Sequence, residues 1–481
     1  MTIVSKAKEN SAFIWSMLNG VGTRALSFLF FVIISRLITP ADFGLMAIAL
    51  AVGLLLDTLI EQGLVDALIQ HPDLRDSHLG SVFVYQVGIA IFLALLLLMT
   101  APLLAVLFHQ PKLSVILPWI GYTSVFNATA WVKQAMFRRE FEFKLLALRN
   151  FVATSLGGLI GLWLAYKGAG VTSLVAMYFS NALFAAIVVW ISSKVSIHIE
   201  FHVQHLKDLL RFSRSILGTR VIEVLSSRLD QIAIGHYFGV EILGYYALAI
   251  RLYEVLLQTT TMPVAEVAYP LFARIQHDKV KLREGYFRLL EYAGGMTIPL
   301  FLGAAAMAPF YIPAFFGAQW IPAIRYVVII LTVGAVNSIG AYNGVLFGAV
   351  GRPDLRLKFA ILGMTLWGLS AVFLLPLGGF YSSVAWAVRT LFTFPIQVRV
   401  ALAQMGASMG EYFRIVLRQV TACLLMAVVI YLVASAPFSI NRVWVMAMQV
   451  MLGAATYMII ASLFGSPMPK RIFQLKRILS D

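Results

Sequence analysis

Charged side chains are scarce in this sequence and make up only 12% of its 481 residues. Soluble proteins carry about twice that share, so the shortage excludes disorder and a nucleic-acid-binding domain and argues against a soluble enzyme. Hydrophobic residues account for 60% of the chain. Such an apolar chain needs lipid as its solvent, where only helices or closed barrels satisfy their backbone hydrogen bonds.

Cysteine is nearly absent as well. Cys423 is the single cysteine, so neither an intrachain disulfide nor a cysteine-based metal cluster can form. The sequence has no G-x-x-x-x-G-K-[ST] loop for ATP, no evident Ser/His/Asp arrangement and only short loops between its apolar runs. We therefore expect a protein that is not an enzyme and uses no cofactor, apart from H+ or Na+ as a coupling ion.

Long apolar runs make up most of the sequence. They continue for about 20 residues, the length of a membrane-spanning helix, and lack the alternation of barrel strands. Proline, glycine and charged residues divide them into fourteen candidate spans. The spans are approximately 11–35, 42–66, 79–101, 113–132, 149–166, 171–192, 213–236, 242–266, 289–311, 323–348, 359–376, 381–403, 415–435 and 442–464. This pattern predicts an all-α integral membrane protein with fourteen transmembrane helices.

The distribution of positive charge tests this count. If the N-terminus is cytoplasmic, 27 of the 37 lysines and arginines lie in cytoplasmic segments, five lie outside and five lie within spans. This asymmetry follows the positive-inside rule. An odd number of spans would reverse the later loops, so we expect an even number with both termini in the cytoplasm. The first apolar run lacks a small-residue cleavage site and is interpreted as a retained span.

The sequence contains a repeat. FGLMAIAL at Phe43–Leu50 resembles LGYYALAI at Leu243–Ile250, 200 residues further along. A second pair, Arg139–Lys144 and Arg352–Lys358, agrees in order and in side of the membrane. The two pairs align spans 1–6 with spans 7–12. Both sets of spans then have the same orientation in the membrane and are related by an axis along the membrane normal. Duplicated transporters of this kind bind substrate between their halves and expose the site alternately.

Several segments are similar to one known family. SRLITPADFG at Ser35–Gly44, IEQGL at Ile60–Leu64 and QAMFRREF at Gln134–Phe141 resemble the Wzx-type, colanic-acid exporter-like polysaccharide flippases. Further matches are Ala67–Gln70, Arg228–Gln231, Gly244–Tyr246, Pro270–Phe272 and Gly348–Pro353. The resemblance covers about residues 10 to 360 and points to the multidrug/oligosaccharidyl-lipid/polysaccharide exporter superfamily.

The resemblance implies two parallel six-helix lobes followed by two further helices. With the repeat, it divides the chain into an N-lobe at 1–192, a cytoplasmic amphipathic linker at 193–212, a C-lobe at 213–403, spans 13–14 at 404–464 and a basic cytoplasmic tail at 465–481. It also implies a multi-pass protein of the bacterial inner membrane that flips polyprenyl-diphosphate-linked oligosaccharide outward for exopolysaccharide, O-antigen or capsule biosynthesis. The expected partners are membrane lipids, a polysaccharide polymerase and a chain-length regulator. No nucleic-acid partner is expected.

The linker at 193–212 is amphipathic, which predicts a connecting helix that lies on the membrane surface. His198, His202 and His205 have a helical spacing that would also suit a metal ion. The connecting helix is the preferred interpretation, and we expect no metal site.

Charged residues inside the spans are expensive, at about 2.5–3.5 kcal/mol each, and they usually face a cavity or a partner. Here they concentrate in the first two spans of each half and in the last span of the second half. The residues are Arg24, Asp57, Glu61, Arg220, Glu223, Arg251, Glu254 and Arg389. This pattern predicts a hydrated central cavity lined mainly by spans 1, 2, 7 and 8.

Each type of side chain in this set has a predicted role. Because guanidinium pairs bidentately with phosphate, the diphosphate ligands would be Arg24, Arg220, Arg251 and Arg389. The carboxylates would pair with these arginines in one state and take up a proton or sodium ion in another; they are Asp57, Glu61, Glu223 and Glu254. The sugar chain would bond to Asn19, Gln258 and Asn337. Residues near span ends are interpreted as helix caps or interface residues, namely Asp66, Arg228, Asp230 and Glu266.

These observations predict an ion-coupled flippase that works by alternating access. In the alternative for the site, the charges are static salt bridges that only hold the helices together. One alternative function is an antiporter of small cationic drugs in the same superfamily, which would need an acidic cavity, whereas four arginines lie in the predicted cavity here. The other is a membrane polysaccharide polymerase, which would need a sizeable outer loop.

Overall fold

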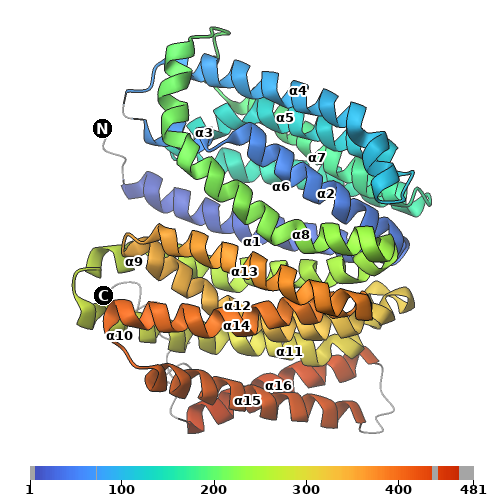
Figure 1. Ribbon diagram of the computed structural model, residues 1–481, viewed down its shortest axis with the longest axis vertical. Coiled ribbons are helices and arrows are strands. Elements are labelled where there is room, and N and C mark those ends of the chain that lie inside the picture. Colours follow the sequence, from blue (N-terminus) through green and yellow to red (C-terminus); the bar gives the residue numbers. More distant parts are fainter. Residues whose placement is uncertain (1–5, 72, 436–441, 465–481) are drawn as a thin grey trace. The chain divides into compact units, whose positions relative to one another are not determined.

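The structure is a computed structural model, and it describes residues 6–71, 73–435 and 442–464 (Figure 1). Within these ranges all regular secondary structure is helical, which confirms the all-α prediction. The basic tail predicted at 465–481 lies outside the described residues.

Backbone contacts divide the chain into two compact units, Met1–Ala247 and Leu248–Asp481. The helices that begin in the first unit are α1 (Lys6–Leu37), α2 (Pro40–Glu61), α3 (Leu64–Gln70), α4 (Asp76–Leu107), α5 (Leu113–Arg139), α6 (Phe143–Tyr166), α7 (Val171–Ser192) and α8 (Val203–Leu256). The second unit continues with η1 (Leu257–Thr261), α9 (Met262–Ile275), α10 (Lys279–Leu289), η2 (Leu290–Gly294), α11 (Gly295–Tyr311), η3 (Ile312–Phe316), η4 (Ala318–Ala323), α12 (Ile324–Ala349), α13 (Pro353–Leu374), η5 (Leu375–Leu377), α14 (Tyr381–Met405), α15 (Met409–Ser435) and α16 (Arg442–Leu463). This division falls inside α8, and the lobe boundaries expected from the repeat stay a prediction.

The described helices follow the predicted spans in order, with one correction. α8 contains the seventh and eighth predicted spans, which are separated at Gly239 by a non-helical backbone with φ 80° and ψ 176°. The second predicted span is not one continuous helix, because it breaks between α2 and α3. Gln62 (φ 51°) and Gly63 (φ 74°) both adopt left-handed backbone angles there, which a right-handed helix cannot accommodate.

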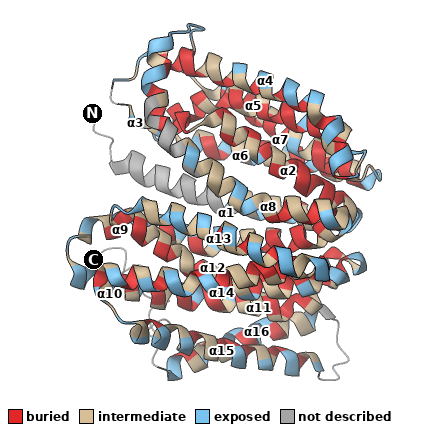
Figure 2. Ribbon diagram, in the orientation of Figure 1, coloured by how far each residue is buried: buried red, intermediate tan, exposed pale blue. Residues whose placement is uncertain are grey.

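Nine helical segments in the described part of the chain are long and apolar enough to cross a membrane. They differ in burial (Figure 2): the most apolar stretch of Pro40–Gln70 is 56% buried within the protein, against 17% for that of Pro353–Leu377. Large apolar side chains such as Met99 and Phe373 are 80% and 76% exposed. Such side chains are stable against lipid tails rather than water, so this is a multi-pass membrane protein.

Glycines in α6 allow close helix packing in the first unit. A Cβ on Gly158 would lie 2.3 Å from the ring of Phe30 in α1, and a Cβ on Gly157 would lie 3.0 Å from the backbone nitrogen of Asn181 in α7. α6 therefore packs tightly against both α1 and α7 through positions where a side chain does not fit.

Gly158→Ala is expected to destabilise the protein by about 1–3 kcal/mol, because the new methyl group must displace the buried ring of Phe30. Thermal unfolding of the detergent-purified protein would measure this loss. The matched control is Gly88→Ala in α4, where no described atom lies within 4 Å of the added Cβ. Equal melting temperatures for the two variants would contradict the packing described here.

In the second unit, aromatic and polar contacts join the helices. The ring of Tyr253 in α8 meets that of Trp386 in α14 edge-on, with 5.3 Å between the centroids. α15 and α16 run side by side (Figure 1), and the buried Gln449 amide in α16 donates to the carbonyl of Ile430 in α15 at 3.1 Å. These two C-terminal helices therefore form a pair bonded through a buried amide.

The predicted connecting helix is wrong in its first half. Residues 193–202 are not helical, and the helix begins only at Val203, as the start of α8. The backbone is instead fixed by a side chain, since Lys133 Nζ donates to the carbonyl of Val195 at 2.8 Å. The helical spacing assumed for His198 is therefore absent.

Candidate functional site

Opposite charges meet where the second predicted span breaks. Glu61 is the last residue of α2, Asp66 lies in the first turn of α3, and Arg220 belongs to α8. Arg220 Nη2 bonds to Asp66 Oδ2 at 2.6 Å, and its Nη1 pairs with Oε2 of Glu61. One guanidinium thus bridges the two helix ends on either side of Gln62 and Gly63. We call Glu61, Asp66 and Arg220 the Arg220 triad.

The Arg220 triad contains more acidic than basic groups. One guanidinium faces two carboxylates, so with both carboxylates ionised the triad keeps one net negative charge. The Glu61, Asp66 and Arg220 side chains are 15%, 34% and 36% exposed, so they are not sealed in the protein interior.

Asp57 lies one turn before Glu61 in α2 but contacts a different neighbour. Its Oδ2 accepts a hydrogen bond from Asn127 Nδ2 of α5 at 3.3 Å. Its Oδ1 is shielded from solvent and has no hydrogen-bond partner among the described residues. An ionised carboxylate with a shielded, unpaired oxygen is costly, so this position suits a bound proton or small cation.

In the second unit, one predicted pair is close together in α8. Arg251 Nη1 lies 3.8 Å from Glu254 Oε2. Gln258 follows in η1, where the helix widens to a π-helical turn, and its side chain is exposed. Because π-helical turns occur often at functional sites, this part of the chain stays a candidate for substrate contact.

Two further predicted residues are brought near each other by α12 and α14. Asn337 Oδ1 accepts a hydrogen bond from Thr390 Oγ1 at 3.3 Å, and Thr390 directly follows Arg389. Arg389 also packs against α13, where a Cβ on Gly363 would lie 2.9 Å from its Nε. The sequence predicted both Asn337 and Arg389 but not their shared neighbour Thr390.

The remaining predicted residues lie on separate helices. Arg24 in α1 and Glu223 in α8 are partly exposed. Asn19 also belongs to α1, at a position whose side chain is outside the described residues. The binding roles of all these residues, like the central cavity, stay predictions.

Sequence reasoning missed three features of the site. It did not anticipate the break after Glu61, the bridging role of Asp66 or the bond from Asn127 to Asp57. The Gln62–Gly63 pair was the available signal, because glycine within an apolar run marks a turn or break. No local pattern marks Asn127, since its partner lies 70 residues away in the chain.

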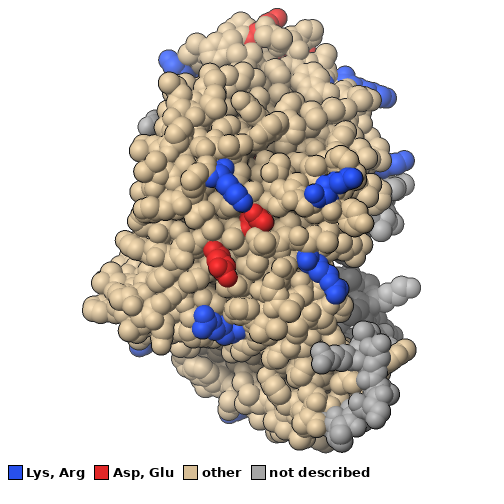
Figure 3. Space-filling model, turned by 90° about the vertical axis from the view of Figure 1, so that its right-hand side faces the viewer, with Lys and Arg blue, Asp and Glu red and all other residues tan. Residues whose placement is uncertain are grey.

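Charge is sparse on the side of the molecule where α4 connects to α5. Figure 3 shows this side, with a few Lys, Arg, Asp and Glu side chains on a largely uncharged surface. The side of the membrane on which this face lies stays a prediction from the positive-inside rule.

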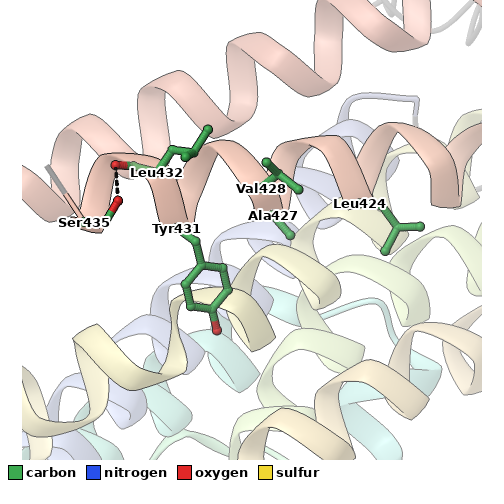
Figure 4. Close-up of a pocket in the computed structure, with 6 residues that line it drawn as sticks. All are labelled: Leu424, Ala427, Val428, Tyr431, Leu432 and Ser435. Atoms are coloured by element: carbon green, nitrogen blue, oxygen red, sulfur yellow. Dashed lines mark hydrogen bonds between the residues drawn. The ribbon is translucent and has the colours of Figure 1, made fainter.

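The surface of α15 contains an open hollow of about 570 Å³ (Figure 4). It is lined by Leu424, Ala427, Val428, Tyr431, Leu432 and Ser435. No charged side chain lines it, so it is suited to hydrocarbon and not to a phosphate group.

Comparison with known proteins identifies the family. The family described as polysaccharide biosynthesis protein matches residues 33–325, more than half of the chain. The succinoglycan biosynthesis transport protein ExoT of Rhizobium meliloti is 28% identical over 308 residues, which are 64% of this chain and 62% of that protein. The chain thus matches less than two thirds of the length of ExoT. The lipopolysaccharide biosynthesis protein WzxC of Escherichia coli is 23% identical over 351 residues, 72% of this chain and 71% of WzxC.

Among solved structures, the lipid II flippase MurJ in an inward closed conformation is similar with a TM-score of 0.75 and 16% identity. The match covers 94% of this chain and 98% of MurJ, and it supports a membrane-transporter fold. The chain therefore belongs to the polysaccharide biosynthesis protein family.

Proposed function

We propose that this protein flips a polyprenyl-diphosphate-linked oligosaccharide from the cytoplasmic to the periplasmic leaflet of the bacterial inner membrane, by ion-coupled alternating access. The family match supports transport in polysaccharide biosynthesis, and relatives named for succinoglycan and lipopolysaccharide support a glycan cargo. The observation that carries the proposal is the Arg220 triad, in which a guanidinium is bound by two carboxylates at a break in a membrane-spanning segment.

The Arg220 triad supplies a mechanism for coupling. With both carboxylates ionised, its net negative charge repels a diphosphate. Protonation of Glu61 and Asp66 leaves the guanidinium as the remaining charge and frees its N–H groups for phosphate oxygens. Loss of these protons lets the carboxylates compete again for Arg220 and expel the anion.

The other predicted residues complete this scheme. Arg24, Arg251 and Arg389 would share the diphosphate with Arg220. Asp57, Glu223 and Glu254 would take part in binding H+ or Na+, and Asp57 is best suited because one of its oxygens has no described hydrogen-bond partner. The sugar contacts would come from Asn19, Gln258 and Asn337.

A transport assay in proteoliposomes tests the proposal directly. The purified protein is expected to flip a polyprenyl-diphosphate-linked glycan and to leave the matching monophosphate-linked glycan in place, because a single phosphate occupies fewer of the guanidinium groups. Equal flipping of both lipids would remove the diphosphate from the recognition step. Absence of flipping together with uptake of a cationic dye would instead favour an antiporter, the alternative that the carboxylate Asp57 would serve.

A further inference from the structure

The two repeated segments of the sequence touch within the first unit. α2 begins at Pro40, and the second part of α8 begins after Gly239. A Cβ on Gly44 would lie 1.8 Å from the carbonyl oxygen of Val240, and a Cβ on Gly244 would lie 1.9 Å from the carbonyl oxygen of Pro40. No side chain fits at either distance, so both positions require glycine. We call Pro40, Gly44, Val240 and Gly244 the glycine crossing.

The two contacts of the glycine crossing are equivalent. Positions 44 and 244 differ by the 200 residues of the repeat, and so do positions 40 and 240. Each repeat thus presents the same surface to the other, which is the mark of a local two-fold axis. The preceding backbone agrees, because Thr39 (φ −81°, ψ 155°) and Gly239 (φ 80°, ψ 176°) are the equivalent non-helical residues before the two helices.

The two sides of the glycine crossing differ in what surrounds the residue before the helix. At the start of α2, Thr39 Oγ1 donates to Asp42 Oδ2 at 2.8 Å, and Lys112 Nζ lies 3.8 Å from Asp42. At Gly239, by contrast, no described atom lies within 4 Å of where a Cβ would be. Gly239 therefore has open space where a side chain would lie, and as a glycine it can adopt backbone angles that other residues rarely reach.

The closest part of the glycine crossing is a contact of backbone with backbone. On each glycine, the hydrogen that replaces the Cβ points toward a carbonyl oxygen of the other helix, which is the geometry of a weak C–H···O bond. Such a contact lets two helices approach closely without interlocking large side chains at this point. It can therefore re-form after separation without repacking those atoms.

We propose that the glycine crossing is the outer gate of the transport cycle, closed in this structure and opened at Gly239 when the cargo leaves. The inference rests on the proposed function, because alternating access needs a contact between repeats that forms in one state and breaks in the other. Both helices follow loops that the sequence predicts to lie outside the cytoplasm, so the gate is assigned to the outer side.

Cysteine labelling tests the gate. In a Cys423→Ala background, Leu243→Cys introduces one thiol beside the glycine crossing at a fully buried position. A membrane-impermeant maleimide added from outside is expected to label it about tenfold faster when Gly44→Ala is also present, because the added methyl group cannot fit in the closed state. Gly88→Ala in place of Gly44→Ala should leave the labelling rate unchanged. Leu117→Cys, equally buried in α5, should stay protected in every background.

The outcomes of the labelling experiment test the gate independently of the proposed cargo. Faster labelling of Leu243→Cys needs no substrate, so it supports the gate even if the flipping assay fails. Unchanged labelling in a Gly44→Ala protein that reaches the membrane at its normal level would overturn the gate. If Gly44→Ala does not accumulate, labelling of Leu243→Cys is measured in the otherwise unchanged protein with lipid-linked glycan and a proton gradient. A rate that does not rise during transport would overturn the gate as well.

Discussion

Arg220→Ala is expected to lower glycan export about tenfold or more, because a hydrogen bond to a charged group is worth about 1.5–3 kcal/mol. The amount of protein in the membrane should stay near normal, since the Arg220 triad is partly exposed and the carboxylates left behind can take up protons. Arg220→Lys should restore export in part, because lysine supplies the charge without the planar fork. Surface glycan and membrane protein level measure the two effects.

A variant of the Arg220 triad without charges tests whether its ion pairs take part in transport or only stabilise the structure. In the variant Arg220→Met, Glu61→Gln, Asp66→Asn, no charge is left unpaired at the break between α2 and α3. If the ion pairs serve only as static supports, this variant should export glycan normally, since apolar or neutral replacements often preserve stability. We expect it to accumulate normally and still fail in export. Arg352→Ala, which removes a surface pair with Asp354, is the control and should change neither measurement.

Asp57→Asn is expected to abolish the dependence of export on a proton or sodium gradient and to reduce its rate about tenfold. The amide has nearly the same volume as the carboxylate but cannot titrate, so the packing around α2 and α5 is preserved. Flipping in proteoliposomes with and without an imposed gradient measures the effect.

The partner residue supplies the control for Asp57. Asn127→Ala removes the hydrogen bond to Asp57 Oδ2 but keeps the titratable group. Its export should remain responsive to the gradient, with a smaller loss of rate than in Asp57→Asn. An Asp57→Asn protein that still responds fully to both gradients would exclude Asp57 as the coupling site.

The fold class and the order of the helices could be predicted because they depend on local properties. Apolar length, breaking residues and loop charge are read along a single stretch of chain, and lipid enforces helices wherever a long apolar run must cross it. The repeat at Phe43–Leu50 and Leu243–Ile250 was also visible locally. The failures arose where local signals were weak, at Gln62–Gly63 and in residues 193–202, whose backbone bonds to distant side chains instead of forming a helix.

The sequence by itself determined a membrane-embedded helical protein and predicted a duplicated design, with arginines and carboxylates in the first two spans of each predicted half. Only the tertiary structure decided which of these charges meet. Arg220 is 159 residues from Glu61 and 154 from Asp66, and Asn127 is 70 from Asp57. It also decided that Gly44 and Gly244 belong to one contact. The composition shows which side chains must avoid lipid. Which charged side chains pair with each other depends on how helices that are distant in the sequence pack, and no local sequence pattern encodes these partners.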